Sequence, residues 1–132
     1  MKFDDNLDLG TSIILPRFQV DSGYLLPFEF NELTNWIPKR SFLLVDKKGS
    51  LRGKHAHRNC KQAFWLLSGS IKISLSNKNK KIIKKIETPE NILCVPEKTW
   101  VELEFLEESY VMVFASEPYD AYDYIYDVKE LE

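Results

Sequence analysis

The feature that most constrains the fold is a series of short segments rich in β-branched and aromatic residues, which runs from Ser12 to Ser116. Turn-forming residues separate these segments, and no stretch keeps the three-to-four-residue apolar spacing of an amphipathic helix. The pattern predicts an all-β chain. Strands are expected near 12–15, 24–30, 40–46, 53–58, 62–68, 70–76, 81–87, 92–95, 100–105 and 110–116.

Two of these segments indicate how the strands should lie. Ile71, Ile73 and Leu75 alternate with polar residues, which predicts one buried and one solvated sheet face. The run 92–95 is continuously apolar and stops at Pro96, which is typical of a strand covered on both faces. Many short strands without a sequence repeat indicate a sandwich or barrel, and a jelly roll is the natural candidate.

The stretch after Ser116, EPYDAYDYIYD, has no clear period. It predicts an irregular tail or a short helix that lies against the strands. A chain of this length buries roughly two thirds of its unfolded surface around one core, so residues 1–132 are expected to form a single domain.

The charge and the apolar runs exclude several classes of protein. The formal net charge is −2, so no overall positive field exists to attract a nucleic acid. No apolar run is long enough to cross a bilayer, and we expect no membrane association. The N-terminal stretch MKFDDNLDLG lacks the apolar core of a secretory signal, and Cys60 and Cys94 are the only cysteines, which predicts a cytoplasmic protein with free thiols.

Both histidines of the chain lie in the stretch LRGKHAHRNCKQ. In a strand, His55 and His57 project from the same face with Ala56 opposite, so two imidazoles should point side by side. A polar turn at 58–60 would fold the chain back, which would let Gln62 meet the histidines.

Three interpretations of the paired histidines are open. The spacing of the histidines, Gln62 and Gly69 is similar to the first metal motif of the cupin superfamily, but the chain lacks that motif's glutamate and has no third histidine. Cys60 is expected in the turn, away from the histidines, so we expect no metal. Histidine also transfers protons near neutral pH without a cofactor. The third interpretation is that the rings only satisfy backbone groups.

Cations crowd the same stretch, and arginine suits phosphate oxygens. At this point the residues resemble a known family. RGxHAH at 52–57 followed by Lys61-Gln62 resembles the sugar 3,4-ketoisomerases, which are cupin-fold, WxcM-like enzymes. The similarity extends to LSGSIK at 67–72, to Val95-Pro96 before Trp100, and to ASEPYD at 115–120 with Tyr124 and Ile125 beyond.

The resemblance implies a cupin-type jelly-roll barrel and an isomerase without a cofactor. Its relatives act on a dTDP-linked 4-keto-6-deoxy sugar, moving the carbonyl from C4 to C3 through an enediol. They are homodimers with intertwined subunits, here expected to exchange N-terminal strands, and they serve deoxyamino-sugar and surface glycan biosynthesis. Carried over, His57 is the chief base and His55 the partner that relays or donates the proton. The implied substrate-binding residues are Arg52, Arg40, Gln62, Lys61 and Trp100, although a tryptophan that begins a strand is more often in the core.

Two segments depart from the family pattern. Family members are rich in tyrosine where this chain has SFLLVD at 41–46, and they carry arginine before glycine where it has Asp21-Ser22-Gly23. Ser41 or Tyr110 could supply the missing hydroxyl. The alternative functions are a non-catalytic or divergent nucleotide-sugar-binding cupin, and a metal-dependent cupin.

Overall fold

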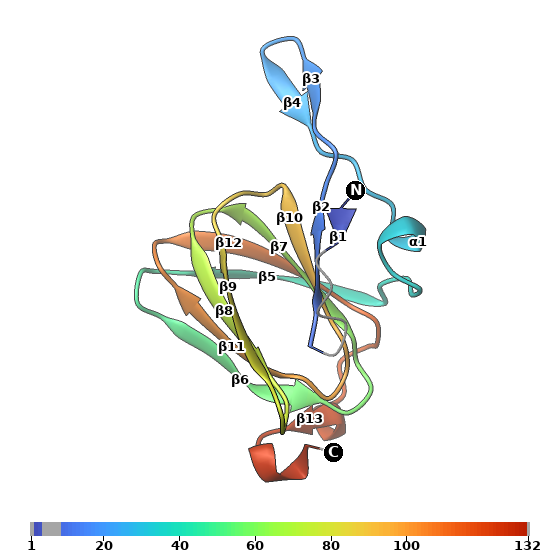
Figure 1. The fold of residues 1–132 in the computed structure, drawn as a ribbon, viewed down its shortest axis with the longest axis vertical. Coiled ribbons are helices and arrows are strands. Elements are labelled where there is room, and N and C mark those ends of the chain that lie inside the picture. The colour runs from blue at the N-terminus through green and yellow to red at the C-terminus, as the bar shows by residue number, and fades with distance from the viewer. Residues whose placement is uncertain (1, 4–8, 132) are drawn as a thin grey trace.

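The computed structural model describes residues 2–3 and 9–131. Two antiparallel sheets face each other and enclose the core (Figure 1). In strand order, the six-stranded sheet contains β1 (Lys2–Phe3), β2 (Thr11–Ile14), β10 (Asn91–Val95), β7 (Gln62–Ser68), β12 (Ser109–Ala115) and β5 (Arg40–Asp46). The five-stranded sheet contains β13 (Tyr124–Ile125), β6 (Leu51–His57), β11 (Trp100–Phe105), β8 (Ile71–Ser76) and β9 (Lys81–Ile86). The expected all-β sandwich or barrel is confirmed.

The main core lies between the two sheets. On β8, Ile71, Ile73 and Leu75 are fully buried, and the polar residues between them face outward, as the alternation predicts. Val111 and Val113 meet them from β12 of the opposite sheet. Each buried aliphatic side chain contributes roughly 1.5–3 kcal/mol relative to its exposed state, so this layer holds the sheets together.

Most of the expected strands are confirmed. The ranges 40–46, 62–68 and 100–105 coincide with β5, β7 and β11. The other expected ranges differ from the observed strands by one or two residues at their ends, except the range 24–30.

The strand expected at 24–30 is wrong. That region contains the hairpin of β3 (Phe18–Val20) and β4 (Gly23–Leu25), followed by the short helix α1 (Phe30–Leu33). Asp21, with a φ of 51°, forms the tight turn between the two hairpin strands. The apolar residues that follow do not form a strand. Phe28 packs edge-on against Trp65, and Phe30 packs edge-on against Phe114.

The C-terminal tail closes one end of the molecule (Figure 1). It contains two 3-10 helices, η1 (Ala121–Asp123) and η2 (Val128–Glu130), with β13 between them. Strand β13 pairs with the end of β6, where Tyr124 lies opposite His57 and Ile125 opposite Ala56. The expectation of an irregular or helical tail is confirmed, and the pairing brings the tail to the histidines. No helix in the described part of the chain has the length and apolarity needed to cross a membrane.

Candidate active site

A β-bulge near the middle of β6 positions the histidines. Gly53 and Lys54 have φ values of 91° and 62°, and the pairing of β6 with β11 shifts register beside them. A Cβ atom on Gly53 would lie 2.6 Å from the carbonyl oxygen of Val101, so only glycine fits. Bulges bend and twist a strand, and this one precedes the segment that carries both imidazoles.

The two imidazole rings lie together, as the strand period predicts. The ring centroids of His55 and His57 are 5.1 Å apart, and the rings meet edge to face at 87°. Their exposure differs, however. His55 is partly buried and lines a cavity, whereas His57 is 4% exposed and is not among the residues that line that cavity. His57 therefore lies next to the cavity wall rather than on it.

Asp123 holds the buried ring. Its Oδ2 lies 2.8 Å from His57 Nδ1, and its Oδ1 accepts a hydrogen bond of 2.7 Å from the Asn59 backbone N–H. A carboxylate only accepts hydrogen bonds, so Nδ1 carries the proton and the lone pair of neutral His57 is on Nε2. That Nε2 atom is buried and has no hydrogen-bond partner. Sequence reasoning missed Asp123, because nothing in the aperiodic tail distinguishes it from the neighbouring aspartates.

Both rings prefer the neutral state. Burial lowers the pKa of His55 below 6.5, and the nearby charge of His57 lowers it further. Burial also lowers the pKa of His57, and this effect outweighs the hydrogen bond and charge of Asp123, which raise the pKa. Both imidazoles are therefore neutral at pH 7 and can accept a proton.

Tyr124 covers both imidazoles. Its ring centroid lies 5.0 Å from that of His55 and 4.5 Å from that of His57. Tyr126 stacks on Tyr124, with ring centroids 5.7 Å apart and an interplanar angle of 12°. The tail therefore supplies an aromatic wall, and Tyr124 also lines the cavity.

The cavity lies between the two sheets and measures about 260 Å³. Its polar lining comes from His55, Gln62, Arg52 and Tyr124. The remaining lining is apolar or glycine: Phe42, Leu44, Leu51, Gly53, Phe64, Val101 and Leu103. A few polar groups in a mostly apolar pocket are typical of small-molecule sites. His55 and Gln62 therefore line the same cavity, whereas His57, which was also expected near Gln62, does not line it.

The two arginines lie in different surroundings. Arg52 lines the cavity, and its Nε donates to Asp46 over 3.2 Å. Arg40 begins β5, and its guanidinium lies 5.1 Å from the ring centroid of Phe42 and 5.5 Å from that of Tyr119. Its buried Nε has no hydrogen-bond partner, so the side chain has a donor to offer a ligand.

Two residues implied as substrate contacts lie elsewhere. The Lys61 ammonium is 3.8 Å from Glu97 and borders a different cleft, beside Trp36 and Cys94. Trp100 is buried in a small cluster with Ala56, Ile125 and Leu131. Neither lines the cavity. Trp100 is instead a core residue, because β13 and the end of the tail cover it.

The hydroxyls considered as replacements for the family's tyrosines also lie outside the cavity. Ser41 on β5 and Tyr110 on β12 are exposed. The next residues, Phe42 and Val111, face the core, so the two hydroxyls lie on the outer face of the sheet. Tyr124 is the phenol that borders the cavity. In the sequence, only the family resemblance of the segment that contains Tyr124 pointed to this residue.

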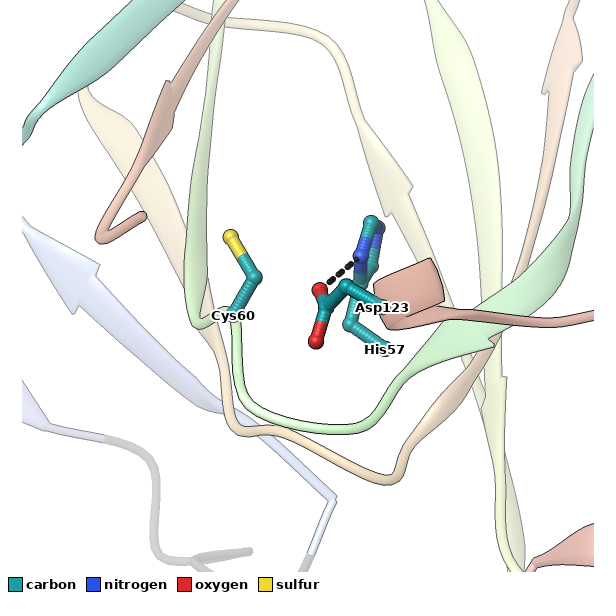
Figure 2. A group of neighbouring side chains, drawn as sticks. All are labelled: His57, Cys60 and Asp123. Carbon is teal, nitrogen blue, oxygen red and sulfur yellow. Dashed lines mark hydrogen bonds and ion pairs between the residues drawn. The ribbon is translucent and has the colours of Figure 1, made fainter. Parts of the chain in front are cut away.

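Cys60 lies closer to the histidines than expected. It occupies the turn after β6, but its thiol is buried, 3% of the residue being exposed. One potential ligand atom each from His57, Cys60 and Asp123 lies within 4.8 Å of the others. Figure 2 shows these three side chains gathered from β6, the turn and η1.

Comparisons with known proteins show which proteins this chain is similar to. The family model described as "FdtA: WxcM-like, C-terminal" matches residues 10–132. A TDP-4-oxo-6-deoxy-alpha-D-glucose-3,4-oxoisomerase from Aneurinibacillus thermoaerophilus is 36% identical over 111 residues, which cover 80% of this chain and 78% of the relative.

Solved structures of such enzymes have the same fold. A sugar 3,4-ketoisomerase from Thermoanaerobacterium thermosaccharolyticum in complex with TDP aligns with a TM-score of 0.86 and 27% identity, over 95% of this chain and 96% of that one. A TDP-quinovose 3,4-ketoisomerase from Campylobacter jejuni aligns with a TM-score of 0.87 and 27% identity, over 97% and 98% of the two chains. The expected family, cupin-type fold and isomerase class are confirmed. The chain belongs to the FdtA/WxcM-like family of sugar 3,4-ketoisomerases.

Proposed function

We propose that this protein is a cofactor-independent 3,4-ketoisomerase of a dTDP-linked 4-keto-6-deoxy sugar. The observation that carries the proposal is a pair of neutral imidazoles at a cavity, with His55 on its wall. A proton next to a ketone is acidic enough for imidazole to remove when a hydrogen-bond donor stabilises the developing oxyanion. The names of the relatives supply the substrate class.

The reaction moves two protons and leaves the formula unchanged. His55 removes the proton from C3, and the C3–H electron pair forms the C3=C4 bond while O4 becomes an enolate oxygen. O4 gains a proton and O3 loses one, which gives an enediol and then its C3 oxyanion. The C3 carbonyl forms as protonated His55, whose proton exchanges with water, delivers a proton to C4. The rings in their neutral state begin this cycle without prior deprotonation.

The roles of the histidines are the reverse of those that the resemblance implied. We assign the carbon proton to His55, because it lines the cavity. His57 is a positioning residue in this proposal: Asp123 fixes its ring, and the ring packs edge to face against His55.

Tyr124 and Gln62 are the proposed donors to the sugar oxygens. Both line the cavity with His55, and a phenol and an amide can each donate to an oxyanion. Tyr124 takes the place of the tyrosines that family members carry near 41–46, where this chain presents Phe42 and Leu44 to the cavity.

The cavity size indicates how the substrate lies. Drug-sized ligands occupy about 300–1,000 Å³, so about 260 Å³ suits a sugar ring rather than a whole nucleotide-sugar. We therefore place the diphosphate at the mouth, with Arg52 and Arg40 as its cations. Arg52 is half-exposed and Arg40 has an unpartnered donor, which supports both assignments.

We also propose that the protein is a homodimer. The β3–β4 hairpin extends away from the sheets (Figure 1). Phe18 and Leu25, which pair across it, are each 54% exposed. A two-stranded hairpin is marginal in water by itself, so an apolar partner surface would stabilise it. An exchanged N-terminal segment provides such a surface.

The position of the carbonyl tests the proposed activity. Carbon NMR of dTDP-4-keto-6-deoxyglucose with the protein should show the carbonyl resonance move from C4 to C3. Titration with TDP in the same preparation serves as the control for binding. TDP binding with no movement of the carbonyl would favour the alternative, a non-catalytic sugar-nucleotide-binding protein.

A further inference from the structure

We propose that His57, Cys60 and Asp123 form a binding site for a single Zn²⁺ ion. The three side chains come from the end of β6, the turn after it and η1 (Figure 2). All three are buried, and one ligand atom from each lies within 4.8 Å of the other two. Imidazole nitrogen, thiolate sulfur and carboxylate oxygen are the ligand types that zinc takes in proteins.

The charges of the ligands suit a buried divalent cation. A Cys60 thiolate and an Asp123 carboxylate together balance Zn²⁺, so the occupied site has no net charge to bury. Arg40 opposes a cation here, since its charge lowers the pKa of His57, but two anionic ligands outweigh one cation.

The exchange of protons balances. Zn²⁺ takes the place of the Nδ1 proton that His57 shares with Asp123, and that proton moves to Nε2, the ring nitrogen without a partner. The Cys60 thiol loses its proton to solvent when the Zn–S bond forms. One proton is therefore released for each ion bound, and affinity should rise with pH.

Neighbouring groups already orient the ligands. The Asn59 backbone N–H holds Asp123 Oδ1, which leaves Oδ2 for the ion. The Cys60 thiol donates to the Lys61 carbonyl oxygen over 3.4 Å, a bond that ends when the thiol loses its proton, and the Ser116 hydroxyl, 4.0 Å from Sγ, can donate to the thiolate. The same hydroxyl accepts from the Lys61 backbone N–H over 2.8 Å, which fixes its position. Outer contacts of this kind raise the affinity of a metal site.

A cleft gives the ion a route to the site. It measures about 360 Å³ and is lined by Asn59, Glu117, Pro118, Tyr119, Asp120 and Asp123. Its three carboxylates attract cations, although Glu117 is 3.7 Å from the Lys39 ammonium. Water in this cleft can complete a four-coordinate shell, because Asp123 belongs to both the cleft and the cluster.

Zinc binding does not depend on the proposed isomerase reaction. If that reaction is correct, zinc would couple to it, because the ion would hold the ring that packs against His55. A failed isomerase assay would leave the metal site untouched, and the experiment that follows measures binding alone.

Cobalt reports thiolate ligation directly. Co²⁺ titrated into the untagged protein, in a reductant that is not a thiol, should bind one ion per chain and give a thiolate-to-cobalt charge-transfer band. Cys60→Ser should lose the band and bind Co²⁺ at least about tenfold more weakly. Cys94→Ser is the matched control and should keep both, because Cys94 lies outside the cluster and burial raises its pKa to about 12. A band that is absent from the wild type, or that survives in Cys60→Ser, overturns the proposal.

A second measurement needs no variant. X-ray absorption of the wild-type protein with one equivalent of zinc should show one sulfur among nitrogen and oxygen ligands. A shell without sulfur, or with two sulfurs, would contradict the site. This result holds even if Cys60→Ser fails to fold.

Discussion

His55 and His57 share one motif, but burial gives them different surroundings. The strand period alone predicts that the two rings are neighbours. It could not predict which ring lies on the cavity wall, because His57 is enclosed by residues far along the chain: Asp123, 66 positions later, binds it, and the next residue, Tyr124, covers it. Long-range contacts of this kind leave no periodic signal in the sequence. The pair was therefore predictable, whereas its acid-base partner was not.

The neutral state of the buried histidines should make stability depend on pH. Their pKa values are lowered in the folded protein, so the unfolded chain binds more protons below pH 6.5. The free energy of unfolding should fall as the pH drops from 6.5 through the folded pKa values, by about 1.4 kcal/mol per unit of pKa difference. Urea unfolding at pH 7.5 and 5.5 measures this loss.

His57→Gln provides the comparison for that pH effect. Glutamine can still donate to Asp123 but does not titrate, so the variant should lose less stability than the wild type between the two pH values. The lowered pKa of Asp46 acts below its ordinary value of 3.8 and lies outside this range. An equal or larger loss in the variant would show that His57 does not contribute.

At the scale of elements, strands with clear alternation were predictable and the irregular features were not. Segments such as β8 carry their burial in a period of two, and their ranges agree with the structure within one or two residues. The β3–β4 hairpin was missed because its strands are three residues long and its apolar side chains are exposed. The bulge at Gly53 was also missed, although a glycine inside a strand is a known signal for one.

Replacing Gly53 by alanine should test what the bulge contributes. The new Cβ would meet the Val101 carbonyl oxygen at 2.6 Å, at a φ of 91° that disfavours alanine. We expect Gly53→Ala to lower the free energy of unfolding by about 1–3 kcal/mol, measured by urea denaturation. Gly49→Ala is a matched control, because Gly49 has a φ of 90° but nothing within 4 Å of the added atom. A cost no larger than that of the control would mean that the bulge tolerates a side chain.

At the scale of the whole molecule, two sheets supply the cavity, and two peripheral segments complete the surroundings. The tail brings Asp123 and Tyr124 to the end of β6, and the hairpin extends from the opposite part of the chain (Figure 1). The resemblance implied a homodimer, and the exposed hairpin is where we expect its interface. The interface residues could not be read from the sequence, because the hairpin itself was not predicted.

Charging the hairpin should dissociate the proposed dimer. Phe18→Asp combined with Leu25→Asp places carboxylates on the exposed hairpin pair. Sedimentation should give twice 15.5 kDa for the wild type and 15.5 kDa for this variant. Ile83→Asp changes an equally exposed residue, 56% exposed on β9, and should remain dimeric. A monomeric wild type, or dissociation by Ile83→Asp alone, would contradict the assignment.

The account depends most on His55 as the group that exchanges a proton with the sugar. Proton NMR in D₂O with dTDP-4-keto-6-deoxyglucose can follow deuterium entering at C3, and TDP titration can confirm that each variant still binds. We predict that the wild type exchanges this proton and that His55→Gln does not. His55→Gln should keep its TDP affinity within about threefold, since we place the diphosphate at the mouth of the cavity, away from His55. Exchange that continues in His55→Gln but stops in His57→Gln would contradict the account and make the buried ring the base.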